Sequence, residues 1–286
     1  MHFPVMRTEV LEYLAPRADG VYLDATAGMF GHAAAVAERL TTGLVIACDR
    51  DAESLEIGLR NAAQWADRIR SEHAKFSELR VLLDKLGIDK VDGLVGDLGP
   101  SLHHFAQADR GFSLMLDGPL DMRLDRSQIQ TAAEIVNLES EKVLADLIYE
   151  FGQERRARKI TRAIVRARPI QSTLHLARVV EQVAPRTGRL HPATQTFMAL
   201  RIATNQELEE LDSLLEQIPK LVASNGRAVF VTFMSLEDRK VKRSFQSLAR
   251  EGRGRILTKH VVRPAGEEIR MNAPSRSAKL RALQLL

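Results

Sequence analysis

Three aspartates close three short apolar runs of this chain: Asp24, Asp49 and Asp97. The runs span residues 21–24, 44–49 and 91–97. Apolar runs of this length, each followed by turn residues, predict buried strands. Because ligands of parallel α/β sheets bind beyond the carboxyl ends of the strands, we expect these three acids to belong to one ligand site.

The loop after the first run favours a nucleotide-type cofactor. Gly28 and Gly31 lie in this loop, where a missing Cβ lets a ligand approach the backbone closely, although a tight turn would use them too. Asp49 follows Gly28 by 21 residues, as a carboxylate that accepts ribose hydroxyls does. The loop lacks a complete G-x-G-x-x-G and any Gly-Lys-Ser/Thr, which disfavours dinucleotides and P-loop triphosphates. An acidic pocket suits a cofactor with an adenosine and a sulfonium, so we expect S-adenosylmethionine.

The segment Asp97-Leu98-Gly99-Pro100 resembles the short acidic motif of amino-group methyltransferases. An exocyclic amine is a poor nucleophile because its lone pair is delocalised into the ring. An acceptor that holds one N–H can orient the amine and stabilise the positive charge that develops as the methyl group arrives. The alternative for Asp97 is an ordinary turn residue at the end of a strand.

The surrounding elements predict a doubly wound, mostly parallel α/β sheet. Helical stretches at 33–40 and 52–63 separate the apolar runs, and strand character returns at 228–233 and 280–285. No convincing strand is predicted between about 105 and 203. The expected domains are residues 1–105 with 204–286, forming one α/β domain, and residues 106–203, forming an inserted helical domain.

The helical insertion carries its own start and stop signals. Gly152 is placed to end one helix, and Pro169 follows the end of the next. Thr173 is expected to cap a third helix. Pro192 suits the first turn of a long helix whose apolar positions continue to Leu215.

Charge and composition bound the function classes. Residues 1–100 hold 11 Lys and Arg against 16 Asp and Glu, whereas residues 151–190 hold 10 against 2 and residues 235–286 hold 13 against 5. The two basic blocks predict a surface that faces a polyanion, with solvated helix faces as the alternative. The single Cys48 excludes an internal disulfide, and the absence of a long apolar run or a leader predicts no membrane partner and a cytoplasmic location. No metal is expected, because the neighbouring His103 and His104 lack the spacing of a metal site.

The order of motifs along the chain resembles one family, ribosomal small-subunit methyltransferase H or MraW. The matching stretches are His2-Phe3-Pro4-Val5, Asp24-Ala25-Thr26 with Gly31-His32, Asp92-Gly93-Leu94 with Asp97-Leu98-Gly99, Arg110-Gly111-Phe112-Ser113, Gly118-Pro119-Leu120-Asp121-Met122-Arg123-Leu124-Asp125, His191-Pro192-Ala193-Thr194, Ala199-Leu200-Arg201-Ile202, Ser235-Leu236-Glu237-Asp238-Arg239 and Ser275-Arg276-Ser277-Ala278-Lys279-Leu280-Arg281. The resemblance implies a class I S-adenosylmethionine-dependent methyltransferase, Rossmann-like, with an inserted helical domain. It also implies methylation of the exocyclic N4 of one cytidine in the decoding region of 16S rRNA.

By matching positions, the resemblance also implies the cofactor contacts. They are Phe30, Gly31, His32, Asp49, Phe76, Asp97 and His104. Asp49 would take the ribose and Phe76 would lie near the adenine, while Asp97 is also the expected catalytic residue. Phe30 stands where the family usually has glycine, and His104 where it usually has glutamine.

Further residues are candidates for the RNA side. Phe105 and Phe112 are candidates to stack on a base that has left its helix, although each could be simple core. Asp121 and Arg123 are expected on the substrate side, with a loop-stabilising charge network as the alternative. Candidates for phosphate contact are Arg158 and Arg162, together with Arg276 and Lys279 near the C-terminus.

Three function classes follow from these observations. The first is a 16S rRNA (cytosine-N4) methyltransferase that acts on the rRNA or on the small ribosomal subunit, with a homodimer as an allowed assembly. The second is a catalytically weakened relative that binds the cofactor and rRNA and acts in subunit assembly. The third, a small-molecule methyltransferase, leaves the two basic blocks unexplained.

Overall fold

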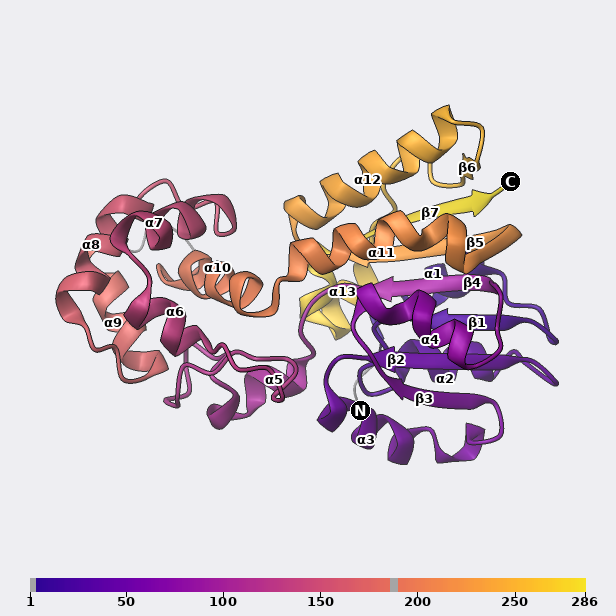
Figure 1. Ribbon diagram of the computed structural model, residues 1–286, viewed down its shortest axis with the longest axis horizontal. Helices are drawn as coiled ribbons and strands as arrows, with labels where there is room; N and C mark the ends of the chain where they lie inside the picture. The colour runs from indigo at the N-terminus through magenta and orange to yellow at the C-terminus, as the bar shows by residue number, and fades with distance from the viewer. Residues whose placement is uncertain (1–3, 186–189) are drawn as a thin grey trace. The chain divides into compact units, whose positions relative to one another are not determined.

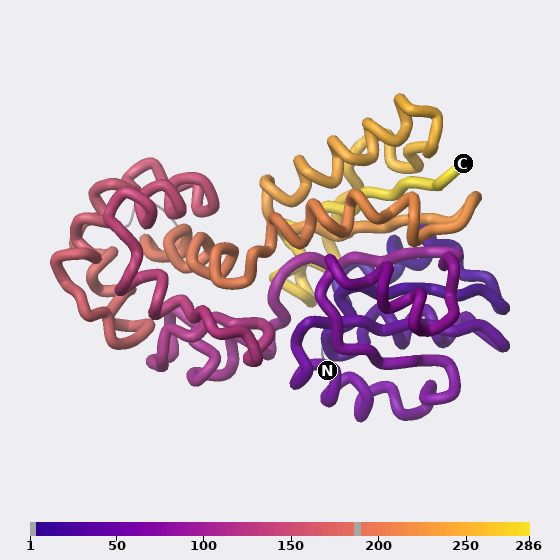
Figure 2. Tube along the Cα trace, in the orientation of Figure 1, coloured from indigo at the N-terminus to yellow at the C-terminus, as the bar shows by residue number. Residues whose placement is uncertain are grey.

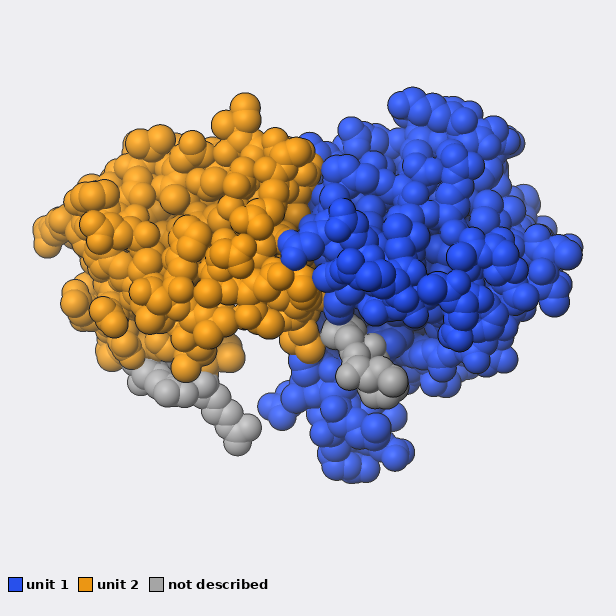
Figure 3. Space-filling model, turned by 90° about the horizontal axis from the view of Figure 1, so that it is seen from below, with its two compact units in different colours: residues 1–99, 208–286 blue, residues 100–207 orange. Residues whose placement is uncertain are grey.

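The computed structural model describes residues 4–185 and 190–286, and Figures 1 and 2 trace their path. The chain divides into two compact units, which Figure 3 colours separately. Unit 1 comprises Met1–Gly99 with Leu208–Leu286, and unit 2 comprises Pro100–Glu207. The expected domain boundaries at 105/106 and 203/204 lie six and four residues from these divisions. His2 and Phe3 of the first family motif lie outside the described residues.

Unit 1 is built on a seven-stranded sheet in the order β3-β2-β1-β4-β5-β7-β6. Its strands are β1 (Val21–Asp24), β2 (Leu44–Asp49), β3 (Ile69–His73), β4 (Val91–Asp97), β5 (Val222–Thr232), β6 (Gly254–Ile256) and β7 (Lys279–Leu285). The pairs among β1 to β5 are parallel, whereas β7 runs antiparallel to β5 and β6. The predicted doubly wound, mostly parallel α/β fold is confirmed.

Successive residues along the strands of unit 1 pack their side chains into two separate hydrophobic cores. In β1, Leu23 joins the core that contains helices α4 (Leu79–Lys85), α11 (Glu207–Leu221) and α12 (Ser235–Arg250). Its neighbour Tyr22 joins the other core, with helices α1 (Arg7–Leu14), α2 (Gly31–Ala37) and α3 (Ala52–Asn61). This alternation follows from the period of two in a strand, and both faces of the sheet are therefore covered by helices.

Unit 2 has no strand among its described residues, 100–185 and 190–207. Its helices are α5 (Leu102–Ala106), α6 (Ala132–Leu138), α7 (Glu141–Glu150), α8 (Ala157–Ala167), α9 (Thr173–Val183) and α10 (Thr194–Asn205). Their apolar faces bury a third core, to which Leu144, Ile160 and Leu200 belong. Local caps fix several of the starts, as where Thr131 and Glu134 form a reciprocal capping box on α6.

Two local expectations for unit 2 are wrong. Ser172 rather than Thr173 caps α9, because its side chain accepts from the His175 N–H. The Thr173 hydroxyl is buried and instead donates to the Leu116 carbonyl at 2.7 Å. The long helix expected after Pro192 is two helices, α10 and α11, since Gln206 lies between them in the left-handed region at φ 49°.

Two short strands were not predicted, β3 and β6. Strand β3, Ile-Arg-Ser-Glu-His, has a single apolar residue, Ile69. Strand β6 at the other edge of the sheet has three residues. Edge strands carry a weak hydrophobic signal, because the sheet pairs them on one side only and leaves much of them in water.

Among the described residues, no helix combines the length and the apolarity that a membrane crossing requires.

Candidate functional site

The three predicted strand-end acids, Asp24, Asp49 and Asp97, close β1, β2 and β4, which are adjacent in the sheet. Strand β1 lies between the other two and pairs with both in parallel, so the three carboxyl ends share one edge. The buried Asp24 carboxyl is near enough to both others for their charges to raise its pKa. The expectation that the fold brings these residues together is thus met in the geometry, and we call them the strand-end acids.

Short hydrogen bonds fix the loop after β1 against the neighbouring strand ends. The Asp97 backbone N–H donates to the Thr26 hydroxyl at 2.6 Å, and the Thr26 N–H donates to Asp24 Oδ1 at 3.1 Å. On the other side, the Gly28 N–H donates to Asp49 Oδ2 at 2.8 Å. Gly28 has φ +49°, a conformation that favours glycine. The loop therefore holds all three strand-end acids before any ligand arrives.

Two oxygens of the strand-end acids are buried without a hydrogen-bond partner among the described residues. They are Asp24 Oδ2 and Asp97 Oδ1. Asp24 is 2% exposed, and burial raises its pKa from 3.8 to about 6. Buried polar atoms are normally paired, so these two acceptors point to an absent donor or cation.

His32, near the start of α2, contacts one of these acids. Its Nε2 lies 3.4 Å from Asp97 Oδ2. Burial alone would lower the pKa of His32, but the polar contact of its ring with the Asp97 side chain, followed by the negative charges of Asp97 and Asp24, outweighs burial and raises that pKa. The imidazole therefore carries positive charge over a wider pH range than a free histidine does.

Of the other predicted cofactor contacts, Phe30 places its ring in the core. It is 1% exposed and lies so close to Gly58 that a Cβ there would collide with it. Phe30 itself caps α2 with φ 67°, an uncommon conformation for an aromatic residue, which core packing stabilises. Gly31 is the first residue of α2 and lies beside Pro4, so that an added Cβ would be 3.0 Å from the proline Cβ.

Phe76 is partly buried against the core, and its backbone carbonyl accepts a hydrogen bond from the Gln217 side chain. Its place near an adenine stays a prediction.

Three predicted site residues with aromatic rings lie in unit 2: one predicted cofactor contact and two candidates to stack on a base. His104 on α5 is buried, and its ring centroid lies 5.2 Å from that of Phe112. Phe112 is a core residue, whereas Phe105 is 38% exposed and meets Phe112 edge to face at 6.1 Å. Phe105 is therefore the better placed of the two to stack on a base, and both roles stay predictions.

Throughout residues 4–185 and 190–286, no three His, Cys, Asp or Glu side chains lie close enough together to hold a metal ion.

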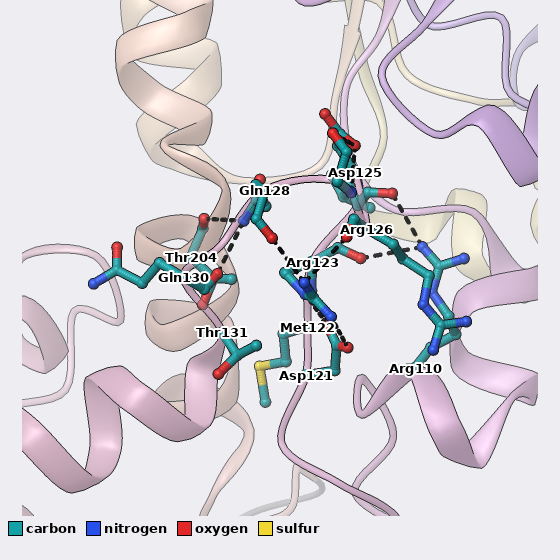
Figure 4. Close-up of polar contacts among 12 residues, drawn as sticks. Arg110, Asp121, Met122, Arg123, Asp125, Arg126, Gln128, Gln130, Thr131 and Thr204 are labelled. Atoms are coloured by element: carbon teal, nitrogen blue, oxygen red, sulfur yellow. Dashed lines mark hydrogen bonds and ion pairs between the residues drawn. The ribbon is translucent and has the colours of Figure 1, made fainter.

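Asp121 and Arg123 form a network within a segment that we call the arginine loop, residues 110–128 (Figure 4). Arg123 donates from Nε to Asp121 Oδ1 and from Nη2 to Oδ2, each at 2.8 Å, and from Nη1 to the carbonyls of Arg126 and Gln128. Although burial raises the pKa of Asp121, the hydrogen bonds from Arg123 outweigh it and lower that pKa. These contacts fit the loop-stabilising alternative, and the role of Asp121 and Arg123 on the substrate side stays a prediction.

Arg110 is a residue of this loop whose role the sequence did not suggest. Its side chain is 0% exposed and donates from Nη2 to the carbonyls of Arg123 and Leu124, both at 3.1 Å. It stands in the Arg110-Gly111-Phe112-Ser113 motif, which was the one available signal. Thr26 was missed in the same way, although it stands two residues after Asp24 in a tight loop.

The predicted basic surface exists on α8. The exposed residues there, with one from the turn before it, are Arg155, Arg158, Lys159, Arg162 and Arg166. Helix α8 contains no acidic residue, and Arg156, which caps it, is held by Glu154. Near the C-terminus Arg276 is exposed, whereas Lys279 lies 4.0 Å from Asp238 and is mostly buried. The predicted phosphate contacts thus differ in availability, and Lys279 is the least available of the four.

Comparisons with known proteins cover the whole chain. Residues 1–286 match the model of the MraW methylase family. "Ribosomal RNA small subunit methyltransferase H" of Solibacter usitatus is 56% identical over 285 residues, which cover 100% of both chains. The protein of the same name from Acidobacterium capsulatum is 45% identical over 293 residues, 99% of this chain and 98% of the relative. Among solved structures, an rRNA methylase from Streptococcus thermophilus has a TM-score of 0.47 at 10% identity, with 98% and 93% of the two chains covered.

Proposed function

Because this chain belongs to the MraW methylase family, a family of S-adenosylmethionine-dependent methyltransferases, we propose that it methylates small-subunit ribosomal RNA. The target we propose is the exocyclic N4 of one cytidine in the decoding region of 16S rRNA. Support for an rRNA substrate comes from relatives that match end to end and carry the name ribosomal RNA small subunit methyltransferase H.

The residues at the strand ends of unit 1 fit S-adenosylmethionine. When bound, this cofactor supplies an electrophilic methyl group on a positively charged sulfur. The unpartnered Asp24 Oδ2 is an acceptor of the kind that a cation or an ammonium group satisfies. Asp49 already accepts the backbone N–H groups of Gly28 and Asp51, and a carboxylate keeps further lone pairs for ribose hydroxyls.

The single observation that carries the proposed reaction is Asp97 Oδ1, buried and without a partner at the end of β4. We assign it to accept one N–H of the cytidine amino group. That hydrogen bond orients the amine and stabilises the positive charge that develops on nitrogen during methyl transfer. As the N–C bond forms, the methyl–sulfur bond breaks and a neutral thioether leaves. One amine proton then passes to solvent, so that a neutral methylamino group remains on the base.

Unit 2 would hold the RNA in this proposal. The exposed arginines of α8 offer charges to several phosphates, and Phe105 offers a partly exposed ring to a base. Phe30 gives no support to the alternative of a catalytically weakened relative. Its ring is buried in the core of unit 1 and does not fill the site at the strand ends.

Methyl transfer from labelled S-adenosylmethionine tests this proposal directly. The protein is incubated with 16S rRNA or with small subunits, and the modified nucleotide is mapped by mass spectrometry. We expect label on N4 of a single cytidine. Label on another base or position would refute the target, and RNA binding without any label would favour the weakened relative. No affinity for rRNA would favour a small-molecule methyltransferase instead.

A further inference from the structure

The role of His32 beside the strand-end acids is open. The residue is the second of helix α2, and its side chain is 5% exposed. Its closest polar contact is that of Nε2 with Asp97 Oδ2, at 3.4 Å, and this contact contributes to the raised pKa of His32.

This contact makes the two oxygens of Asp97 unequal. Oδ2 faces the imidazole, whereas Oδ1 is buried and has no partner. The backbone of Asp97 is fixed separately by the Thr26 hydroxyl, so the remaining freedom is rotation of the carboxylate about its own bond. A positive charge that holds Oδ2 leaves Oδ1 as the oxygen that can accept a substrate N–H.

We propose that His32 is a positioning residue, whose imidazolium holds Asp97 Oδ2 so that Oδ1 is presented to the substrate amino group. This role rests on the proposed function for its chemical purpose. The geometric part, a charged contact between His32 and Asp97, stands without it. His32 touches neither the amine nor the transferred methyl group in this assignment.

Charged groups from four elements surround the imidazole. Asp97 on β4 and Asp24 on β1 favour its protonation, and Arg7 on α1 opposes it. Glu268, on α13 (Gly266–Met271), also interacts with His32 and accepts the Met6 N–H at 2.7 Å. The carboxylates outnumber the single cation, so the protonated form of His32 is favoured. As pH rises through the pKa of His32, the imidazolium and its hold on Asp97 are lost.

Histidine NMR tests the contact without any need for activity. The full chain is labelled at histidine Cε1, and His32 is assigned by the loss of its signal in His32→Gln. We expect the midpoint of its titration to move to lower pH in Asp97→Asn, because a favourable negative charge is removed. Exchange of the exposed Asp109, an acid of unit 2, for Asn serves as the control and leaves the midpoint unchanged. A midpoint that Asp97→Asn does not move would overturn the proposal and leave His32 as an ordinary core residue.

Kinetics then test the consequence. For His32→Gln we expect kcat to fall about 100-fold, as for a misplaced catalytic group, with the KM for RNA unchanged. We expect the wild-type kcat to fall at alkaline pH as His32 loses its proton, and we expect this fall to be absent in His32→Gln, because glutamine does not titrate. The exposed His260→Gln should keep the wild-type profile. Circular dichroism checks folding, and His32→Asn replaces His32→Gln if the latter does not fold.

The outcomes separate the two proposals. If His32→Gln keeps the wild-type kcat and pH profile, the positioning role is wrong while the methyltransferase function stands. If the wild type transfers no methyl group but Asp97→Asn still moves the His32 titration, the proposed function fails and the charged contact remains.

Discussion

Asp121 of unit 2 and the strand-end acids Asp24 and Asp97 of unit 1 differ in whether their carboxylate oxygens have partners. In unit 2, both oxygens of Asp121 are held by the guanidinium of Arg123, and that guanidinium also binds two carbonyls of the arginine loop. In unit 1, Asp97 Oδ1 and Asp24 Oδ2 have no hydrogen-bond partner within the described chain. The ion pair of Asp121 stabilises a loop, whereas Asp24 and Asp97 each keep one oxygen that can still accept a hydrogen bond from a ligand.

This difference distinguishes structural acids from chemical ones. A buried carboxylate without a partner costs free energy, so a fold keeps it only where a ligand or reaction needs it. For a paired carboxylate, the attraction within the ion pair offsets the free-energy cost of removing it from water, and the pair makes its loop more rigid. The PLDMR string around Asp121 is the more distinctive sequence signal, yet the unpartnered oxygens are the reason that we propose the strand ends of unit 1 as the reactive region.

The largest effect expected is that of Asp97→Asn. Loss of the negative charge from the acceptor of the substrate N–H should lower kcat about 10²–10³-fold, as removal of one electrostatic transition-state contact does. The fold should persist, because asparagine has nearly the same size and shape and the backbone N–H of residue 97 stays bound to the Thr26 hydroxyl. Single-turnover label transfer and thermal unfolding measure the two quantities. Asp121→Asn should show the opposite division, with a lower unfolding temperature and a much smaller change in kcat. Equal loss of kcat in both variants would contradict the comparison.

The pH dependence of stability should separate the same two kinds of acid. The pKa of Asp24 is raised to about 6, so the folded protein binds its proton more tightly than the unfolded chain, and this residue costs stability as pH rises from about 4 to 6. Asp24→Asn should therefore gain on the order of 3 kcal/mol over the wild type above pH 6. The pKa of Asp121 is lowered, so its contribution is present above the unfolded value of 3.8 and is lost as pH falls below it. Urea unfolding from pH 3 to 8 tests both signs, and a destabilised Asp24→Asn at pH 7 would refute the first.

Arg110 extends the comparison to buried cations. Replacement by Met keeps much of its volume but leaves the carbonyls of Arg123 and Leu124 without a donor. We expect a loss of about 3 kcal/mol in the free energy of unfolding. Arg126→Met is the matched control, because its 3.3 Å pair with Asp109 is exposed and contributes less than about 1 kcal/mol. Similar losses in both variants would show that burial does not set the value of these contacts.

The smallest effect concerns the surface of α8. The double change Arg158→Glu and Arg162→Glu should weaken binding of 16S rRNA about tenfold and reduce its salt dependence, because fewer phosphate counterions are released. Cofactor affinity should stay the same. The double change Arg39→Glu and Lys142→Glu, at two exposed positions outside α8, alters the net charge equally and is the control. Filter binding at several salt concentrations measures the slope, and an unchanged affinity would remove α8 from the RNA surface.

Much of the framework could be predicted from local patterns. The strands that end at Asp24, Asp49 and Asp97 were correctly placed because each is a compact apolar run with a polar end. Helices α7 and α8 followed from apolar residues at helical spacing and from Gly152 and Pro169. Strand β3 escaped because its residues are mainly polar, and the break at Gln206 escaped because apolar spacing continues through it.

Only the tertiary structure decided which charges are free. The sequence offered Asp121 a local partner, Arg123 two residues on, and offered Asp97 none, but it did not show whether either carboxylate would be paired in the fold. Their fates depend on partners: Asp121 meets Arg123 two residues away, whereas Asp97 is tied to Thr26, 71 residues distant, and faces His32. Hydrophobic periodicity is a local property and can be read along a chain. Whether a buried oxygen finds a donor depends on contacts between distant segments, which exist only once the sheet has formed.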